Sequence, residues 1–255
     1  MRPFAISSLS FAVLFAAAVA AHYYFGSSWW PAIILTVLYF HLLVFGAIYI
    51  RWNFYLRSLH GGKDTKAIAL TFDDGPAGET EAILGLLQQE GVLAAFFTIG
   101  KNAAAHPQLV RRWDREGHII GNHSYHHGFH FDWKSARAIA DELRATNDVI
   151  NKITGKKPRL FRPPYGVTNP NVAGAVRLMG MTSVGWSIRS FDTTAKDPKQ
   201  LLDRILRQLK GGDIILLHDS VPMTRQILTT LIQTARQKGF TFVPLNQLLD
   251  LEAYA

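Results

Sequence analysis

Cysteine is absent from this chain of 255 residues, and its absence removes several kinds of chemistry. The chain forms no disulfide, has no cysteine-ligated metal site and has no thiol nucleophile. The absence of cysteine does not identify the cellular compartment. A metal site or a hydrolytic centre in this chain must therefore be sought among histidines and carboxylates.

Charged residues are also missing from the N-terminal part of the chain. No Lys, Arg, Asp or Glu lies between Arg2 and Arg51, whereas charges are frequent from Arg51 onward. Two apolar runs, residues 4–21 and residues 31–50, are long enough to cross a bilayer as helices, the first only marginally. Between them lie aromatic residues of the kind that settle at a membrane interface, namely Tyr23, Tyr24, Trp29 and Trp30. We expect residues 1–55 to form a membrane anchor of two transmembrane helices.

Two other interpretations of the apolar runs stay open. The first run follows a single arginine and contains the small residues Ala-Val-Ala at 18–20, as in a cleaved signal peptide, which would leave one membrane anchor. The third interpretation is a buried hairpin in the core of a soluble protein, although core helices rarely extend so far without charge.

Downstream of residue 66, apolar strand patterns alternate with helical patterns. The strand patterns are residues 67–72, 94–99, 118–121, 159–162, 182–188, 213–217 and 240–244. The helical patterns are residues 79–90, 107–116, 135–154, 169–179, 198–209 and 224–238. This alternation predicts an α/β fold with a parallel sheet covered by helices, either an open doubly wound sheet or a small barrel. Both place functional residues at the C-terminal ends of strands.

Two carboxylates and two histidines follow predicted strands. Asp73 and Asp74 end the first strand, and because adjacent strand residues point in opposite directions, one carboxylate can bind a metal while the other receives a proton. Taken alone, the Asp-Gly-Pro stretch could equally be a surface turn. His123 and His127 are four residues apart, so both would share one face of a helical turn and reach one ion. Together with Asp74 they would form a His₂-carboxylate site suited to Zn²⁺ and other divalent ions.

Two further segments place polar residues after apolar strands. Arg162 precedes Pro163 and Pro164, whose rigid rings would hold Arg162 and the amide of Tyr165 in position; a plain strand-exit turn is the alternative. His218 ends the apolar strand 213–217, where a histidine could serve as a general acid at neutral pH.

Four motifs in this order resemble the polysaccharide deacetylase family, the NodB-homology or carbohydrate esterase family 4 group. They are Thr-Phe-Asp-Asp-Gly at 71–75, His-Ser-x-x-His at 123–127, Arg-Pro-Pro-Tyr at 162–165 and Leu-Leu-His at 216–218. The resemblance covers residues 66–249, and we expect the domain to extend over residues 64–250. It implies a distorted (β/α)7 TIM-like barrel.

The resemblance also implies roles for the site residues. Asp73 would be the catalytic base and Arg162 would orient it. The backbone amide of Tyr165 would help to form the oxyanion hole, and His218 would be the acid. The metal would be a divalent ion, Zn²⁺ first and Co²⁺, Ni²⁺ or Mn²⁺ as alternatives. Its ligands would be Asp74, His123 and His127.

One family motif is altered in this chain. The family commonly has an Asp-x-x-Asp-Trp pattern after the fifth strand, and here the corresponding residues are Arg189, Asp192 and Thr193. Asp192 is retained and would pair with Arg162. Arg189 and Thr193 replace an acid and a groove-lining aromatic residue, so we expect an altered substrate groove with retained chemistry.

These features favour a metal-dependent hydrolase that removes the N-acetyl group from an amino sugar in a glycan or glycolipid. One alternative is a deacetylase or deformylase of a lipid-linked amino sugar at the membrane. Another is a catalytically inactive carbohydrate-binding or scaffold protein, whose signature would be a missing ligand or base. A serine hydrolase is disfavoured because Ser183, Ser187 and Ser190 lack the Gly-x-Ser-x-Gly context.

The basic residues suggest an orientation and a partner. The second apolar run is followed by basic residues, whereas the loop between the runs has none; these residues are Arg51, Arg57, Lys63 and Lys66. The positive-inside rule then places the N-terminus and the catalytic domain in the cytoplasm, while an enzyme acting on exported cell-wall glycan would face outward. The net charge of +8 suits membrane lipid or a phosphorylated lipid substrate. We expect no nucleic-acid partner, because no basic cluster is interleaved with aromatic residues.

Overall fold

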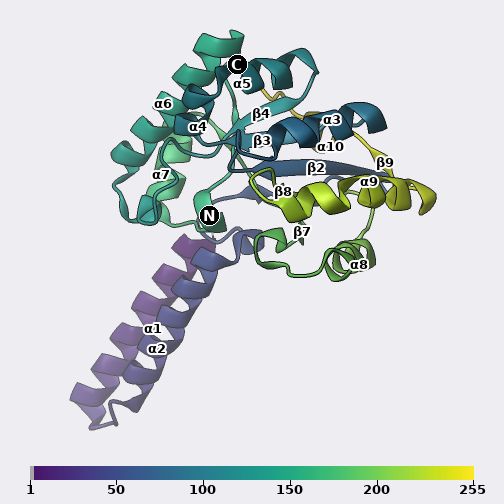
Figure 1. Ribbon diagram of the computed structural model, residues 1–255. Coiled ribbons are helices and arrows are strands. Elements are labelled where there is room, and N and C mark those ends of the chain that lie inside the picture. The colour runs from purple at the N-terminus through teal and green to yellow at the C-terminus, as the bar shows by residue number, and fades with distance from the viewer. Residues whose placement is uncertain (1–2) are drawn as a thin grey trace.

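The computed structural model describes residues 3–255. Met1 and Arg2, which include the arginine expected at the start of a signal peptide, lie outside the described residues. A long helical hairpin leads into an α/β domain (Figure 1). The strands are β1 (Ser58–Leu59), β2 (Ala67–Asp73), β3 (Ala95–Thr98), β4 (Ile119–Asn122), β5 (Leu160–Phe161), β6 (Thr182–Val184), β7 (Ile188–Arg189), β8 (Ile214–His218) and β9 (Thr241–Phe242). The helices of the domain are α3 (Thr80–Glu90), α4 (Gly100–Ala105), α5 (Pro107–Arg115), α6 (Ala136–Thr154), α7 (Pro170–Leu178), α8 (Pro198–Gln208), α9 (Pro222–Gln237) and α10 (Leu245–Leu249).

The hairpin consists of α1 (Pro3–Phe25) and α2 (Trp30–Ile48), and both helices are long and apolar enough to cross a membrane. They pack against each other, with the rings of Phe11 and Tyr39 stacked at 4.2 Å, and project away from the domain (Figure 1). The most apolar stretch of α1 is 0% buried and that of α2 is 11% buried. The interpretation as the buried core of a soluble protein is therefore wrong, and both helices are candidate membrane spans.

The strand order of the sheet is β1-β6-β5-β4-β3-β2-β8-β7, with parallel pairing throughout and β9 paired to the start of β2. From β2 to β6 the chain adds each strand on the same side of the preceding one, without the reversal of a doubly wound sheet. The sheet curls, and helices cover its outer surface (Figure 1). The predicted distorted α/β barrel is confirmed.

The predicted single strand at residues 182–188 is wrong in one respect, because this segment forms two strands. β7 lies at one end of the strand order and β6 lies beside β1 at the other, and residues 185–187 cross the gap between them. The amide of Gly185 donates to Leu59 O at 2.7 Å and that of Ser187 to Ile214 O at 3.1 Å, so the two ends of the segment bond to different neighbours. Ile50, which follows α2, packs with Val184 and Trp186 at this gap. The apolar run is continuous, so periodicity alone gives no sign of the break.

Alternation along β2 and β8 directs side chains to two cores. Ile68, Leu70 and Phe72 pack against the helices, while the intervening Ala67 and Ala69 face the interior of the barrel. The same alternation places the side chain of Asp73 toward the interior. On β8, Ile214 and Leu216 face inward, and His218 continues that series. Asp73 and His218 are also register partners, so two polar residues meet at the C-terminal ends of neighbouring strands.

The sheet and its contacts extend slightly beyond residues 64–250. β1 pairs with β6 through Ser58 and Leu59, and the hydroxyls of Ser58 and Ser183 lie 2.7 Å apart. At the other end, Tyr254 forms a bridge with Pro158, and its hydroxyl accepts the amide of Ile120 at 2.8 Å. The segment linking the hairpin to the domain is thereby built into the sheet.

Candidate metal and catalytic site

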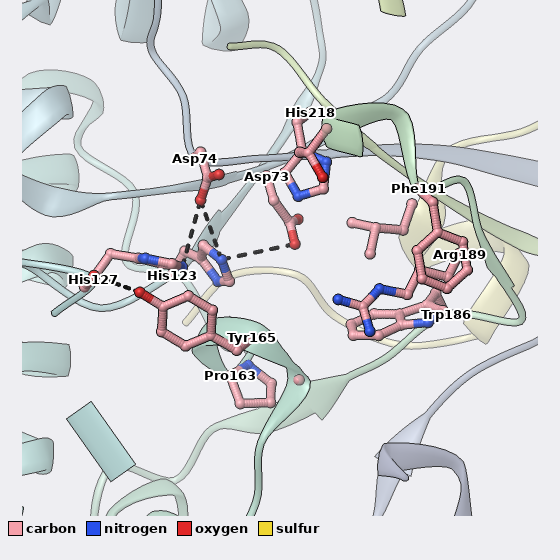
Figure 2. Close-up of a pocket in the computed structure, with 13 residues that line it drawn as sticks. Asp73, Asp74, His123, His127, Pro163, Tyr165, Trp186, Arg189, Phe191 and His218 are labelled. Atoms are coloured by element: carbon pink, nitrogen blue, oxygen red, sulfur yellow. Dashed lines mark hydrogen bonds and ion pairs between the residues drawn. The ribbon is translucent and has the colours of Figure 1, made fainter. Parts of the chain in front are cut away.

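A cavity of about 210 Å³ opens at the C-terminal ends of the strands, as expected for this class of fold. Six of the predicted site residues line it, namely Asp73, Asp74, His123, His127, Tyr165 and His218 (Figure 2). The other two, Arg162 and Asp192, are buried beside the cavity and contact Asp73 and His218, respectively. The structure therefore brings together every residue that the sequence predicts for the site.

Three of these residues form a cluster that can hold a metal ion. Ligand atoms of Asp74, His123 and His127 all lie within 4.8 Å of one another. Oδ1 of Asp74 is 3.6 Å from Nε2 of His123 and 3.5 Å from Nε2 of His127 (Figure 2). Within residues 3–255, this Oδ1 atom is buried without a hydrogen-bond partner, which is costly unless a ligand satisfies it. The donor set fits a divalent cation with open coordination positions.

His123 is prepared for metal binding by its surroundings. Its Nδ1 lies 2.7 Å from the carbonyl oxygen of Arg162, so Nδ1–H donates and Nε2 keeps its lone pair. Burial, with a smaller effect from His127, lowers the pKa of His123 to about 3. The imidazole is therefore neutral at ordinary pH, and no proton competes with a cation for Nε2.

The two histidines converge through a loop, not through the helical turn that their spacing suggested. Ser124 and His127 both have left-handed backbone conformations, with φ of 66° and 51°. Asn122 Oδ1 accepts the amide of Ser124 at 2.9 Å, and Ser124 Oγ accepts the amide of His127 at 3.1 Å. Glu142 accepts the amide of His126 at 3.2 Å and pairs with a lysine. These side-chain acceptors fold the loop in place of helical hydrogen bonds.

Asp73 and Asp74 face the same cavity, contrary to the expectation that they point in opposite directions. Asp74 follows the last residue of β2 with φ of 76°, so the strand alternation no longer applies to it. Nε2 of His123 consequently lies near both carboxylates, at 3.6 Å from Asp74 and 3.8 Å from Asp73. Their surroundings still differ, because Asp73 is 3% exposed and Asp74 is only half-buried.

Arg162 is fully buried and its guanidinium is bonded on several sides. NH1 donates to Asp73 Oδ1 at 2.7 Å and to Thr71 Oγ1 at 2.8 Å. Nε and NH2 donate to the carbonyl oxygens of Val184 and Gly185 at 3.2 and 2.8 Å. Burial raises the pKa of Asp73, while the nearby guanidinium opposes that rise. Arg162 thus holds the Asp73 carboxylate in one orientation and offsets part of the cost of its burial.

Asp192 pairs with His218, so the expectation that it pairs with Arg162 is wrong. Oδ1 of Asp192 lies 2.8 Å from Nδ1 of His218, and Oδ2 accepts the His218 amide at 2.7 Å. Burial lowers the pKa of His218, but the hydrogen bond and charge of Asp192, with smaller effects from Asp73 and Asp74, outweigh it and raise the pKa to about 9. His218 therefore carries a proton at neutral pH.

Trp186, in the wall of the cavity, and Asp219, beside it, are among the residues that the sequence did not single out. Trp186 lines the cavity and packs its ring against Gly166, where a Cβ atom would collide with it. Asp219 is fully buried, accepts a hydrogen bond from Thr80 at 2.5 Å and has a second oxygen without a partner in the described chain. Burial raises its pKa to about 7, against the hydrogen bond from Thr80. The only sequence signal for Asp219 is its place directly after His218 at the end of an apolar strand.

The opposite walls of the cavity differ in character. On one side Tyr165 lies over His127, with ring centroids 4.7 Å apart and its backbone at φ of 59°. On the other side lie Trp186, Arg189 and Phe191, with the Arg189 guanidinium 5.6 Å from the Trp186 ring and 5.0 Å from the Phe191 ring (Figure 2). Arg189 therefore adds a positive charge to the wall where the related motif has an acid.

Comparison with known proteins agrees with this arrangement. The family model for polysaccharide deacetylases matches residues 60–184. The peptidoglycan-N-acetylmuramic acid deacetylase PdaA of Bacillus subtilis is 36% identical over 194 residues, which cover 74% of this chain and 73% of that protein. The chain belongs to the polysaccharide deacetylase family. The peptidoglycan-N-acetylglucosamine deacetylase PgdA of Listeria monocytogenes is 32% identical over 187 residues, which cover 73% of this chain but only 39% of that protein.

Solved structures extend the comparison to the fold of this polysaccharide deacetylase. The Bc1960 peptidoglycan N-acetylglucosamine deacetylase superposes with a TM-score of 0.74 at 29% identity, covering 78% of this chain and 95% of that one. Like the relatives named as peptidoglycan deacetylases, this chain is a hydrolase that acts on N-acetyl amide bonds in carbohydrates. A Bacillus anthracis relative described as a pseudoenzyme superposes with a TM-score of 0.69 at 28% identity, covering 75% of this chain and 68% of that one. The signature expected of an inactive member, a missing ligand or base, is not found among the site residues described here.

Proposed function

We propose that this protein removes the N-acetyl group from an N-acetylated amino sugar by metal-dependent hydrolysis at a membrane surface. The observation that carries the proposal is the cluster of Asp74, His123 and His127 beside a buried Asp73 that is paired with Arg162. Zn²⁺ is the first choice for this donor set, with Co²⁺, Ni²⁺ and Mn²⁺ as alternatives. When bound, such a cation supplies a Lewis acid that polarises the acyl carbonyl and acidifies water.

The side chains of this site divide the proton transfers between them. Asp73 accepts the proton of the attacking water, and its buried carboxylate, held by Arg162, is oriented for that task. The backbone amide of Tyr165 donates to the oxyanion that forms on the acyl carbon. His218, whose Nδ1 is engaged by Asp192, gives the proton on Nε2 to the departing amine. The products are acetate and the free amino sugar, without a covalent enzyme intermediate.

Two kinds of substrate fit this reaction. Three of the relatives named above, PdaA, PgdA and Bc1960, are named as peptidoglycan deacetylases, which favours a polymeric N-acetylated sugar. A second candidate is an amino sugar linked to a membrane lipid. The observation that favours it is a second cavity, which shares Trp186, Arg189 and Phe191 with the catalytic pocket and reaches the end of α2. With the hairpin in a membrane, the end of α2 would lie at the lipid surface, and this supports a substrate that reaches the pocket from the lipid.

The proposal is tested with the purified full chain in detergent, stripped of metal and then reloaded. Acetate release from N-acetylglucosamine oligomers and from a lipid-linked N-acetylhexosamine is expected to require the metal. The Asp73→Asn variant should lose turnover while it still binds the ion, because Asp73 does not belong to the ligand cluster. Full turnover by Asp73→Asn, or acetate release by the stripped protein, would contradict the proposed mechanism.

A further inference from the structure

A second cavity lies between the hairpin and the catalytic pocket, and we name it the junction cavity. Its volume is about 590 Å³. It is lined by Ile48 at the end of α2, by residues 49–52 that follow it, and by His60, Trp186, Arg189 and Phe191. The last three also line the catalytic pocket, so the two cavities adjoin. Figure 2 shows these three side chains grouped at the side of the catalytic pocket opposite His127.

The junction cavity is positively charged. Arg51 and Arg189 line it, and within residues 3–255 its lining includes no carboxylate. Arg51 donates to the carbonyl oxygen of Ser187 at 3.4 Å, and Arg189 contacts aromatic rings, but neither has an acidic partner in the described chain. Both guanidinium groups therefore keep donors for a ligand. A guanidinium group matches phosphate in charge and in the geometry of its hydrogen bonds.

The position of the junction cavity relates it to the bilayer. α2 ends at Ile48, and the next residues include Tyr49 and Trp52, whose rings stack at 5.4 Å and are about half exposed. Exposed aromatic residues at the end of an apolar span are typical of the lipid headgroup region. With α2 in a membrane, the junction cavity lies at the level of the headgroups and the catalytic pocket lies next to it.

An apolar hollow continues from the junction cavity along the hairpin. It is formed where α1 begins and α2 ends, it is lined by Ile6, Leu42 and Phe54 among others, and it shares Trp52 with the junction cavity. The order of surfaces is thus apolar beside the helices, cationic at the end of α2, and catalytic beyond Arg189. This order matches an amphiphile in which a lipid chain, a phosphate and a sugar follow one another.

We propose that the junction cavity binds the phosphate of a lipid-linked amino sugar, with Arg51 and Arg189 as the phosphate-binding residues. The inference rests on the proposed function and names its substrate class. In a 2-acetamido sugar joined to phosphate at its anomeric carbon, the phosphate and the amide are attached to neighbouring carbons. The phosphate site must then adjoin the amide site, and Arg189 lines both cavities. The lipid chain extends over the apolar hollow into the bilayer.

The test uses the full chain in lipid nanodiscs and three substrates. They are a polyprenyl-phosphate-linked N-acetylglucosamine, N-acetylglucosamine 1-phosphate without a lipid, and an N-acetylglucosamine oligomer without phosphate. Arg51→Gln and Arg189→Gln are each expected to lower the ratio of kcat/KM for the lipid-linked sugar to that for the oligomer by about tenfold, the loss of one charge-assisted contact. Arg57→Gln is the matched control, since Arg57 is exposed and lines a different hollow, and its ratio should not change.

Each outcome decides the inference. If the ratio of kcat/KM values is unchanged in both arginine variants, the inference is wrong. It is also wrong if N-acetylglucosamine 1-phosphate and the lipid-linked sugar have equal kcat/KM, because the cavity would then be a site for free phosphate. If Arg51→Gln does not fold, Arg51→Lys keeps the charge but loses the paired donors and should show a smaller fall in the same ratio.

The failure of the proposed function is recognised separately. If the proposed function fails, no substrate releases acetate. Binding of the lipid-linked sugar is then measured through the fluorescence of Trp52 and Trp186, which line the junction cavity. A dissociation constant about tenfold weaker in Arg51→Gln than in Arg57→Gln would uphold the phosphate site without the reaction. Equal dissociation constants would overturn it.

Discussion

Asp192 contacts His218 at two points, one on the ring and one on the backbone. One carboxylate oxygen lies 2.8 Å from Nδ1 of the ring, and the other accepts the amide of the same residue at 2.7 Å. Thr224 donates to that second oxygen at 2.6 Å. The Asp192 carboxylate is bonded to both the backbone amide and the ring of His218. This one carboxylate therefore sets both the orientation and the charge of the His218 ring.

Asp192→Asn is expected to move the alkaline limb of the pH–rate profile. With a pKa of about 9, His218 keeps its proton through neutral pH, so kcat should fall only as the pH rises through about 9. Without the Asp192 charge, burial lowers the pKa of His218 and the limb should shift toward 6.5 or below. Thr224→Val is the control, because it removes a hydrogen bond but leaves the charge. An unshifted limb in Asp192→Asn would show that His218 is not the acid.

Arg162→Leu is expected to destabilise the fold strongly. It removes the cation beside Asp73 and leaves a carboxylate that is 3% exposed without its charged partner. Breaking one side of a buried ion pair costs about 3–5 kcal/mol, measured here as the free energy of unfolding in urea. The double variant with Asp73→Leu should recover part of this loss, since no unpaired charge then remains. Equal losses in the single and double variants would argue that packing, not charge, is responsible.

His127→Ala is expected to weaken binding of the divalent ion by more than about 100-fold. Removing a residue that only orients a metal ligand lowers metal affinity by about 10- to 100-fold, and removing a ligand itself should lower it further. Metal content after dialysis against a chelator measures the effect. His126→Ala is the matched control, since His126 lies in the same loop, is exposed and does not belong to the cluster. Equal metal content in the two variants would contradict the assignment of His127 as a ligand.

Asp219→Asn is expected to flatten the dependence of stability on pH. Burial raises the pKa of Asp219 from 3.8 to about 7, so the neutral carboxyl stabilises the fold fully below pH 3.8. That contribution is lost as the pH rises to about 7. Between pH 3.8 and about 7, the wild type should lose on the order of a few kcal/mol of its free energy of unfolding, and Asp219→Asn should not show this loss. Urea unfolding at several pH values gives the free energy of unfolding, and Asp203→Asn, at an exposed position, is the control. If this free energy depends on pH in the same way in the wild type and in Asp219→Asn, the prediction is wrong.

The absence of cysteine allows a direct test of membrane topology. We expect Ser28→Cys, between the two helices, and Lys63→Cys, after them, to lie on opposite sides of the membrane. Labelling of intact cells with an impermeant maleimide should modify Ser28→Cys and spare Lys63→Cys, because basic residues favour the cytoplasmic side. The reverse pattern would place the catalytic domain outside. A mature chain that begins after residue 20 would instead support the cleaved signal peptide.

Local rules of sequence predicted much of this protein because they concern neighbours along the chain. Long uncharged runs indicate the two hairpin helices, and alternating apolar patterns indicate the strands and most helices. The residues of the four motifs converge because the C-terminal ends of parallel strands meet at one edge of a sheet. Asp73 and His218 could thus be placed at the same edge of the sheet, and the structure makes them register partners.

Tertiary structure decided the features that depend on distant contacts. The break between β6 and β7 depends on which strands residues 182–189 meet, and periodicity does not report this. Left-handed conformations at Asp74 and His127 direct side chains in ways that strand or helix periods do not anticipate. The choice of His218 over Arg162 as the partner of Asp192, and the junction cavity beside Arg51, follow from segments far apart in sequence packing together. Short-range periodicity sets the elements, whereas long-range packing sets which charges meet.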